Sequence, residues 1–513
     1  MGGRAARVRL VRAPLASFFF VLAVCYYIFC MSEKYTPTIG LEIHAELKTR
    51  TKMFCNSKND PDETRPNVNV CPVCIAHPGT LPVINKEAVK HVFRVGVAIG
   101  GTCADFTEFD RKNYFYPDIP KGYQLSQYKY PLVSGGILNG VAVTRVHLEE
   151  DTATSLHEKG DYSLVDFNRA GVPLMELVTE PVIHGGKEAV DFARELQLLL
   201  RYLGASEANM EKGEMRVEAN ISVNQESGIK NQELGTKVEV KNLNSFRAVE
   251  RAIAYETERQ IALLEAGDKV VQETRGWDEN TGTTFSQRRK EESHDYRYFP
   301  DPDLPKLMLS EIPEFSADVL RKGFPELPSE KRKRYLEVYK LKAEYAELFV
   351  QDGFYGALFE GVAKKVPKHD QELISLAGNY IASDLIGLLK ANTGSRALVC
   401  GEHFHSSFLK LMQMIKDSVV SSRGAKDILA ILCVEGGDPE VIAVHEGLLQ
   451  KSNESELTDV VQKIISDHRS AVDEYKKGKD AALQFLVGQG MKATKGSANP
   501  AMLAKIFKEV LGQ

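Results

Sequence analysis

Residues 40–47 read GLEIHAEL, a stretch that alternates apolar and polar side chains and decides the fold of the first half of the chain. Successive side chains of a β-strand point to opposite faces of a sheet, so the odd-numbered residues form an apolar face. The other face carries Glu42, His44 and Glu46. Such a polar face is either solvated, as in many antiparallel sheets, or it holds a cation. Further strands of the same kind distinguish these alternatives.

Three further segments repeat this pattern. They are VTRVHLEED at 143–151, MRVEANISV at 215–223 and TKVEVKNLN at 236–244. Each has an apolar face, and each polar face sets a carboxylate two residues from a cation or an imidazole. Solvated faces usually carry mixed Thr, Ser, Lys and Gln, so four acid-bearing strands favour a Mg²⁺–nucleotide site on one sheet. Lysine and arginine side chains beside such a site would contact phosphate oxygens.

Neither common phosphate-binding loop is present in the sequence. Gly186-Lys187 is followed by Glu and Gly478-Lys479 by Asp, and no G-x-G-x-x-G follows a predicted strand. A nucleotide would therefore be bound by the sheet itself, in a cradle.

Length and composition set the scale of the molecule. A chain of 513 residues is too long for one hydrophobic core and predicts about three domains. Hydrophobic residues at 43% and charged residues at 26% are ordinary for a globular protein. The formal net charge of −5 argues against a uniformly basic nucleic-acid binder, but it allows local basic patches.

The pattern changes along the chain from strands to helices. Residues 31–310 hold short alternating strands, glycine turns and two predicted helices at 185–204 and 247–266. Four prolines between 300 and 313 exclude a long helix there, and helical spacing dominates beyond Pro328. The predicted fold class is α+β. We expect a mainly antiparallel β cradle with helices at 31–310, an all-helical middle domain at 311–440 and a small helical tail domain at 441–513.

The first thirty residues form a different kind of sequence. Four arginines precede the apolar run PLASFFFVLAVCYYIFC at 14–30, which resembles a signal peptide or a short membrane anchor. Met31 then opens an ordinary cytosolic start, only a few residues before the first strand. We interpret residues 1–30 as an over-extended start and expect a cytoplasmic protein, with a membrane anchor at 14–30 as the alternative.

Three cysteines raise the question of a metal. Eight cysteines in so long a chain suggest a reducing compartment, and Cys71 and Cys74 form a C-x-x-C pair. Cys55 and His77 lie nearby in the sequence. A closed structural zinc site needs four ligands, so these residues are either a zinc knuckle with His77 as fourth ligand or reduced, packed thiols.

Several long segments resemble one family, the B subunit of the tRNA-dependent aspartyl/glutamyl amidotransferase. The resemblance covers roughly residues 36–513, and DFNRAGVPLMEL at 166–177 is its most specific signature. The segments that carry it are GLEIHAELKT (40–49), DRKNYFYPDIPKGYQLSQ (110–127), RVHLEEDTAT (145–154), SLVDFNRAGVPLMELVTEP (163–181), GTKVEVKNLNSF (235–246), DYRYFPDPDLP (295–305) and FLVGQGMKATKGSANP (485–500).

The resemblance implies an ATP- and Mg²⁺-dependent activity in the cradle domain. The family phosphorylates the side-chain carboxylate of Asp or Glu wrongly attached to tRNA(Asn) or tRNA(Gln), and ammonia then displaces the phosphate. This order is chemically reasonable, because an acyl phosphate has a good leaving group and a free carboxylate does not. The substrate would be Asp-tRNA(Asn), Glu-tRNA(Gln) or both.

The same resemblance assigns roles to residues of this chain. His44 and Glu150 are the expected catalytic residues, and Asn168 and Arg169 lie in the signature, in either functional or structural roles. The expected Mg²⁺ ligands are Glu42, His44, Glu149, Glu150, Glu218 and Glu239. The expected phosphate contacts are Arg111, Lys112, Lys237 and Lys241.

This chain departs from the family pattern at one cysteine motif, and the resemblance also implies partner subunits. Zinc-bearing members of the family have a C-x-C where this chain has Cys55-Asn56-Ser57, which leaves three thiols at Cys55, Cys71 and Cys74 for zinc. No serine-rich amidase loop is found in the sequence. We therefore expect ammonia to come from glutamine through the amidase A subunit of a heterotrimer, whose third member is the small C subunit.

The predicted tail domain is expected to bind tRNA. Five of its lysines lie within twenty residues of one another, with only Asp480 among them, and a solvated lysine face is the alternative. These lysines are Lys476, Lys477, Lys479, Lys492 and Lys495. For the whole chain, the other hypotheses are a non-catalytic zinc-knuckle tRNA-binding adaptor and a membrane-tethered scaffold.

Overall fold

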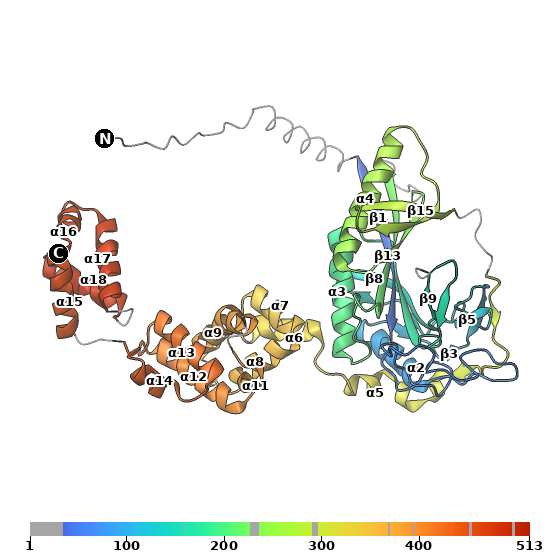
Figure 1. Ribbon diagram of the computed structural model, residues 1–513, viewed down its shortest axis with the longest axis horizontal. Helices are drawn as coiled ribbons and strands as arrows, with labels where there is room; N and C mark the ends of the chain where they lie inside the picture. Colours follow the sequence, from blue (N-terminus) through green and yellow to red (C-terminus); the bar gives the residue numbers. More distant parts are fainter. Residues whose placement is uncertain are drawn as a thin grey trace. The chain divides into compact units, whose positions relative to one another are not determined.

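The computed structural model describes residues 34–157, 160–225, 235–289, 296–367, 370–391, 394–450, 454–494 and 498–512. The predicted leader at 1–30 and Lys495 lie outside these ranges. The chain divides into two compact units, the first ending at Leu327 and the second beginning at Pro328 (Figure 1). A strand-rich unit followed by a helical one confirms the predicted α+β class.

A ten-stranded sheet forms the centre of the first unit (Figure 1). All its strand pairs are antiparallel except the parallel pair β13–β14. The spatial order is β15 (Thr283–Arg289), β14 (Glu273–Asp278), β13 (Val238–Leu243), β12 (Met215–Gln225), β1 (Tyr35–Glu46), β11 (Pro173–Thr179), β8 (Val141–Glu150), β6 (Val133–Ser134) and β2 (Thr102–Cys103), with β7 (Ile137–Leu138) also paired to β8. The four predicted acid-bearing strands thus share one sheet.

Helices cover the apolar face of this sheet. Leu41 and Ile43 of β1 are completely buried there, as the alternation predicts. Figure 1 shows α3 (Gly186–Tyr202) and α4 (Phe246–Glu265) along one side of the sheet. Their boundaries agree closely with the helices predicted at 185–204 and 247–266. Sequence analysis misses the third helix, α2 (Lys86–Ala98), which is capped by the Asn85 side chain. Burial on one face leaves the polar side chains of the same strands on the other.

Three small sheets complete the first unit. They are β16 (Phe299–Pro300) with β4 (Asp110–Asn113) and β5 (Tyr123–Ser126), β9 (Thr154–Leu156) with β10 (Leu164–Asp166), and β3 (Phe106–Thr107) with β17 (Leu307–Met308). The β16–β4–β5 sheet contacts the end of β8. Ser126 Oγ donates to Glu149 Oε2 at 3.1 Å, and Gln127 Oε1 accepts from Leu148 N at 3.0 Å. This small sheet therefore borders the polar face.

The first unit continues beyond residue 310, where sequence analysis places its end. The segment holds η2 (Leu309–Glu311), η3 (Pro313–Phe315) and α5 (Ala317–Lys322). Phe315 and Leu320 are buried in the core of the first unit, and the Phe315 ring lies 5.3 Å from that of Phe93. This apolar packing explains why the unit ends at Leu327.

The second unit is helical throughout its described residues. The helices are α6 (Pro328–Glu337), α7 (Ala343–Gln351), α8 (Gly353–Ala363), α9 (Gln371–Tyr380), η4 (Ile381–Leu385), α10 (Ile386–Lys390), α11 (Arg396–Val399), α12 (Glu402–Lys416), α13 (Ser422–Val434), α14 (Pro439–His445), α15 (Glu454–Asp467), α16 (Arg469–Lys476), α17 (Asp480–Ala493) and α18 (Pro500–Leu511). Residues 371–390 are long and apolar enough to span a membrane, but 44% of the window is buried, as in many core helices.

The start predicted for the tail domain falls inside a helix. Residue 441 lies within α14, and Val420 forms a β-bridge with Leu449, so the chain packs with the preceding helices up to about Gln450. Helices α15 to α18 have a hydrophobic core of their own, which includes Leu457, Leu486 and Phe507.

Candidate active site

The centre of the polar face is a row of four side chains across four adjacent strands. Strand register aligns Arg216 of β12 with His44 of β1, His44 with Glu176 of β11, and Glu176 with His147 of β8. The row exists because every strand is antiparallel and in register at this level. Two imidazoles therefore flank one carboxylate.

Carboxylates converge on these imidazoles. His44 Nε2 lies 3.4 Å from Glu176, 3.6 Å from Glu149 and 4.0 Å from Glu42. His147 Nε2 lies 3.3 Å from Glu176. Glu149 and Glu176 are almost fully buried, so their charges interact at short range and low solvent screening. We call these five residues, Glu42, His44, His147, Glu149 and Glu176, the acid cluster.

A second group of acids adjoins the acid cluster. The carboxylate oxygens of Glu42, Glu218 and Glu239 all lie within 4.8 Å of one another. Lys241 Nζ pairs with Glu218 at 2.6 Å and approaches Glu239 at 3.6 Å. Glu42 belongs to both groups, so the acidic surface is continuous from β8 to β13.

Burial and neighbouring charges shift the pKa values of three residues of the acid cluster. Burial, and then the charges of Glu176 and Glu218, raises the pKa of Glu42 to about 7. Burial opposes the charge of His44, but the contact with Glu176 and the charge of Glu149 outweigh it and raise the pKa of His44 to about 9. Burial likewise opposes the charge of Glu176, yet His147 and His44 hold its pKa well below the usual value.

An arginine–carboxylate network borders the row. Arg169 contacts Asp151 at 2.6 Å and Glu46 at 2.5 Å, and Arg216 contacts Asp151 at 3.1 Å. Burial disfavours the charge of Asp151, but Arg216 and Arg169 outweigh it and lower its pKa. Arg169 of the signature segment thus connects Glu46 of β1 with Asp151, which follows β8. Arg216 lies beside His44 in the strand register, at the edge of the acid cluster.

The predicted phosphate contacts separate into two groups. Burial opposes the charge of Lys112, but the charges of Glu149 and Glu176 raise its pKa, so this ammonium lies near the acid cluster. Lys241 is in the adjoining acid group. Arg111 instead pairs with Asp301 at 2.6 Å and Asp303 at 3.0 Å, and Lys237 is exposed. The structure therefore places only Lys112 and Lys241 beside the acids.

Glu150 does not join the acid cluster, contrary to the expected ligand set. Neighbouring residues of a strand point to opposite faces, so Glu150 leaves β8 away from Glu149. Its carboxylate accepts from Lys121 Nζ at 2.6 Å and from Leu125 N at 3.0 Å. It lines a cavity of about 200 Å³ that Cys55 and Cys74 also line.

Asn168 has the structural role that sequence analysis left open. Its side-chain oxygen accepts from Val68 N and Asn69 N, both at 2.8 Å, and its amide group donates to Arg65 O at 2.7 Å. The side chain is buried and ties the loop at 65–69 to the signature segment.

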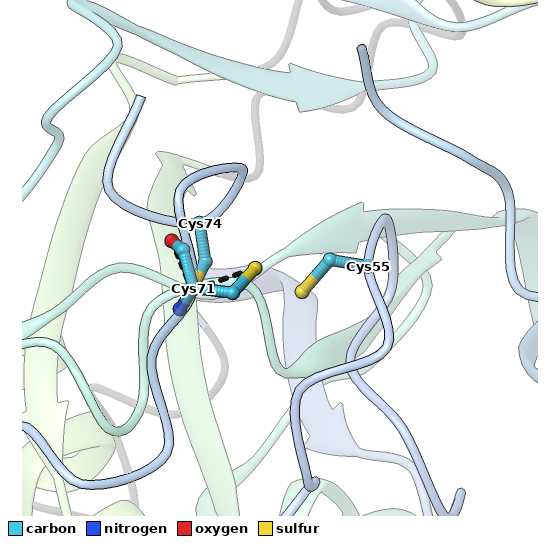
Figure 2. A group of neighbouring side chains, drawn as sticks. All are labelled: Cys55, Cys71 and Cys74. Carbon is cyan, nitrogen blue, oxygen red and sulfur yellow. Dashed lines mark hydrogen bonds between the residues drawn. The ribbon is translucent and has the colours of Figure 1, made fainter. Parts of the chain in front are cut away.

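Three cysteines converge from two loops. Figure 2 shows Cys71 and Cys74 on one loop and Cys55 on another, with their sulfur atoms directed toward one another. All three Sγ atoms lie within 4.8 Å of one another. Cys71 N donates to Cys74 Sγ at 3.0 Å, and Ser57 Oγ lies 3.8 Å from the same sulfur. His77 is exposed and its ring nitrogens are not part of this group, so its role as a fourth ligand stays a prediction.

The pKa values of the Cys55 and Cys74 thiols shift in opposite directions. A hydrogen bond with Cys55 is the main cause that lowers the pKa of Cys74 to about 4, and the same bond raises the pKa of Cys55. The backbone amide of Cys71 also stabilises the Cys74 thiolate. The thiolate is the form of cysteine that binds metal.

Comparison with known proteins matches both units to one family. Residues 37–313 match the GatB/GatE catalytic domain, and residues 357–511 match the GatB domain. The B subunit of the aspartyl/glutamyl-tRNA(Asn/Gln) amidotransferase of Thermoanaerobacter pseudethanolicus is 42% identical over 94% of this chain and 100% of its own length. The same protein of Synechocystis is 41% identical over 93% and 98%. The chain belongs to this family. The predicted family membership is confirmed.

Membership of the amidotransferase B family leads us to expect that Mg²⁺ and ATP bind here. The ligand atoms of the acid cluster are of the kind that binds Mg²⁺. Ligand atoms of Glu42, His44 and Glu176 lie within 4.8 Å of one another, as do those of His147, Glu149 and Glu176. Burial, followed by the charges of Glu176 and Glu218, raises the pKa of Glu42, and a bound cation would offset both causes. His147 Nδ1 is buried without a hydrogen-bond partner among the described residues. Carboxylate oxygens with few imidazoles suit a hard divalent cation.

Sequence analysis of this amidotransferase B chain missed Glu176 and His147 as site residues. Glu176 is the only charged residue of β11, and a lone carboxylate in an otherwise apolar strand is the signal that identifies it. His147 lies two residues before Glu149, on the same face. Asp151 and Arg216 pair with each other at 3.1 Å, and their pairing depends on strand register.

The tail lysines of this family member are on the surface. Lys476, Lys477, Lys479 and Lys492 are all exposed, at the end of α16 and on α17. Lys479 also pairs with Glu474 at 3.5 Å. Exposure suits phosphate contacts and equally suits a solvated face, so the tRNA role stays a prediction.

Proposed function

We propose that this chain is the subunit that carries out the ATP-dependent activation and amidation of Asp-tRNA(Asn), Glu-tRNA(Gln) or both. In this reaction the side-chain carboxylate of the misattached amino acid takes the γ-phosphoryl group, and ammonia then displaces phosphate to form the amide. The observation that carries the proposal is the acid cluster, which gathers three carboxylates and two imidazoles on one sheet face.

Different residues of the chain would bind the metal and the phosphates. Glu42, His44, Glu149 and Glu176 would hold Mg²⁺, with His44 binding in its neutral form after the cation displaces its proton. When bound, Mg²⁺ would neutralise charge on the phosphates and orient them. Lys112 lies among these acids, and Lys241 and Arg216 flank them, so the three cations would contact phosphate oxygens from different sides. Burial of Glu149 and Glu176 limits water at the reacting centre.

The carbon–nitrogen ligase reaction needs an ammonia donor. We propose that a partner, the amidase A subunit, releases ammonia from glutamine, and that the small C subunit is the third member of the heterotrimer. The purified chain alone is then expected to be inactive with glutamine and active with a high concentration of ammonium. Glutamine-dependent turnover by the single chain would contradict this part of the proposal.

The decisive experiment is ATP hydrolysis that depends on misacylated tRNA, measured with the amidotransferase complex. His44→Ala is expected to abolish both hydrolysis and amide formation, because it removes the centre of the acid cluster. Arg111→Ala is the matched control, since Arg111 pairs with Asp301 outside the cluster. Normal hydrolysis by the His44→Ala protein would contradict the proposal. Tight tRNA binding without any hydrolysis by the wild-type complex would favour the adaptor hypothesis instead.

Two remaining features stay predictions. Zinc at Cys55, Cys71 and Cys74 is a proposal that the convergence of the thiols supports. A cytoplasmic place of action is the second prediction, and mass spectrometry of the mature N-terminus shows whether residues 1–30 are present.

A further inference from the structure

A pair of stacked tyrosines lies at the border of the acid cluster and is not used by the proposed reaction. The rings of Tyr128 and Tyr298 are 4.4 Å apart between centroids and inclined by only 14°. Tyr128 is 67% exposed. Among the described residues no other ring stacks on Tyr128.

Both tyrosines are fixed to the β16–β4–β5 sheet. Tyr128 N donates to Asp110 Oδ2 at 2.9 Å. The Asn113 amide donates to Tyr296 O and Arg297 O at 3.2 and 2.9 Å, just before Tyr298. Both attachments come from β4, so the backbone segments that carry the two rings are held to the same strand.

The two tyrosines lie near the acid cluster. Ser126 Oγ donates to Glu149 at 3.1 Å, and Tyr128 follows only two residues later. Lys112 Nζ lies 5.1 Å from the Tyr296 ring, whose centroid is 6.2 Å from that of Tyr298. Lys112, Glu149 and Glu176 also act on the Tyr298 hydroxyl, whose pKa burial raises to about 12. A ligand with phosphates at the acid cluster would extend toward these rings.

We propose that Tyr128 and Tyr298 form a stacking platform for an adenine ring. Every nucleobase has a π-face, and stacking on an exposed aromatic ring gives affinity without requiring a specific hydrogen bond. Two ligands of the proposed reaction carry an adenine ring: ATP, and the tRNA whose terminal adenosine carries the amino acid. This inference rests on the proposed function, since it assumes that phosphates bind at the acid cluster.

The test compares ligands with and without adenine on the full amidotransferase complex. The ligands are Mg²⁺–ATP, Mg²⁺–tripolyphosphate, and tRNA with or without its terminal adenosine. Tyr128→Ala is expected to weaken one adenine-bearing ligand roughly 5- to 100-fold and leave tripolyphosphate affinity unchanged. Tyr128→Phe keeps the ring and should bind like wild type. Tyr116→Ala is the matched control, an exposed tyrosine outside the pair.

The pattern of affinity changes identifies the source of the adenine. A loss confined to ATP assigns the platform to the nucleotide, and a loss confined to tRNA with its terminal adenosine assigns it to the acceptor end. Unchanged affinity for both ligands overturns the platform, as does an equal loss in Tyr128→Phe or an equal loss of tripolyphosphate. Failure of His44→Ala to weaken tripolyphosphate would instead count against the proposed function.

Discussion

Glu149 and Glu150 are adjacent in sequence and lie on opposite faces of the sheet at the end of β8. Glu149 is 3.6 Å from His44, while Glu150 pairs with Lys121 at 2.6 Å. We expect Glu149→Gln to weaken Mg²⁺ or Mn²⁺ binding roughly tenfold or more, because it removes a charged donor from the acid cluster. Glu150→Gln should bind the metal like wild type. Metal titration in the presence of ATP checks both, and equal losses would contradict the placement.

Glu176 connects the two imidazoles of the row. In Glu176→Gln, His44 loses a charge that raises its pKa, and the cluster loses one charged oxygen donor. We expect amidation to fall roughly a hundredfold or more, with metal affinity reduced as well. Glu180→Gln is the control, because Glu180 lies just beyond β11 and bonds to Thr144. Steady-state amidation at saturating Mg²⁺ separates weak binding from lost chemistry.

At the scale of an element, the cysteine loops would form a metal site with three thiols. Ser57 Oγ lies 3.8 Å from Cys74 Sγ, so Ser57→Cys would place a fourth sulfur beside the other three. We expect this variant to bind zinc about tenfold or more tightly than wild type. Cobalt substitution shows the number of thiolates through its charge-transfer absorption, which should be stronger in the variant.

The matched control for this site is Ser57→Ala, which removes the hydroxyl and adds no ligand. Its cobalt spectrum should show the same three thiolates as wild type, and Cys74→Ser should show fewer. Absence of any cobalt–thiolate absorption in wild type and in Ser57→Cys would mean that the cysteines are simply reduced and packed.

Helices α6 and α8 are joined by one carboxylate. Glu360 accepts from Arg334 at 2.7 Å and from the Tyr335 hydroxyl at 2.9 Å. Burial opposes its charge, but these hydrogen bonds lower the pKa of Glu360 below its ordinary value of 4.5. A lowered folded-state pKa means that the charge stabilises the fold above about pH 4.5 and that this contribution is lost as pH falls through the folded-state value.

We therefore expect Glu360→Gln to reduce the free energy of unfolding by about 1 kcal/mol near neutral pH. The difference from wild type should shrink as pH falls below about 4, where Glu360 itself becomes protonated. Chemical denaturation at several pH values measures it, with the exposed Glu337→Gln on α6 as the control. A difference that stays constant with pH would show that the carboxylate charge is not responsible.

At the scale of the whole molecule, we predict that the tail helices are a separable element that binds tRNA. Helices α15 to α18 have their own core, and the chain up to about Gln450 packs with α12 and α13. Deleting residues 451–513 is therefore the appropriate truncation, since a cut at 441 would break α14. We expect the KM for misacylated tRNA to rise strongly, while ATP affinity stays close to wild type.

Salt dependence distinguishes phosphate contacts from a solvated face. Tight tRNA binding should weaken steeply with salt, and the slope should shrink by about one unit for each lysine–phosphate pair that a substitution removes. Single changes at Lys476, Lys477 and Lys492 measure this directly. If the truncated protein binds tRNA with wild-type affinity and slope, the tRNA contacts lie elsewhere.

The sequence by itself determined the fold class, the shared sheet of the acid-bearing strands and the family. Alternation in GLEIHAEL and its three counterparts specifies which side chains leave each strand on the polar face, because the strand period is two residues. The long signature around DFNRAGVPLMEL identifies the family, because such a match depends on residue identity and not on spatial arrangement. His44, Glu42 and Glu149 could be predicted as neighbours on these grounds.

Only the tertiary structure decided which polar residues meet. Strand order brings β11 between β1 and β8, which places Glu176 between His44 and His147, and no local pattern contains that order. The same geometry sends Glu150 to the opposite face and pairs Arg111 with Asp301, 190 residues away. The physical reason is that side-chain direction is local to a strand, whereas strand order and register depend on the packing of the whole core.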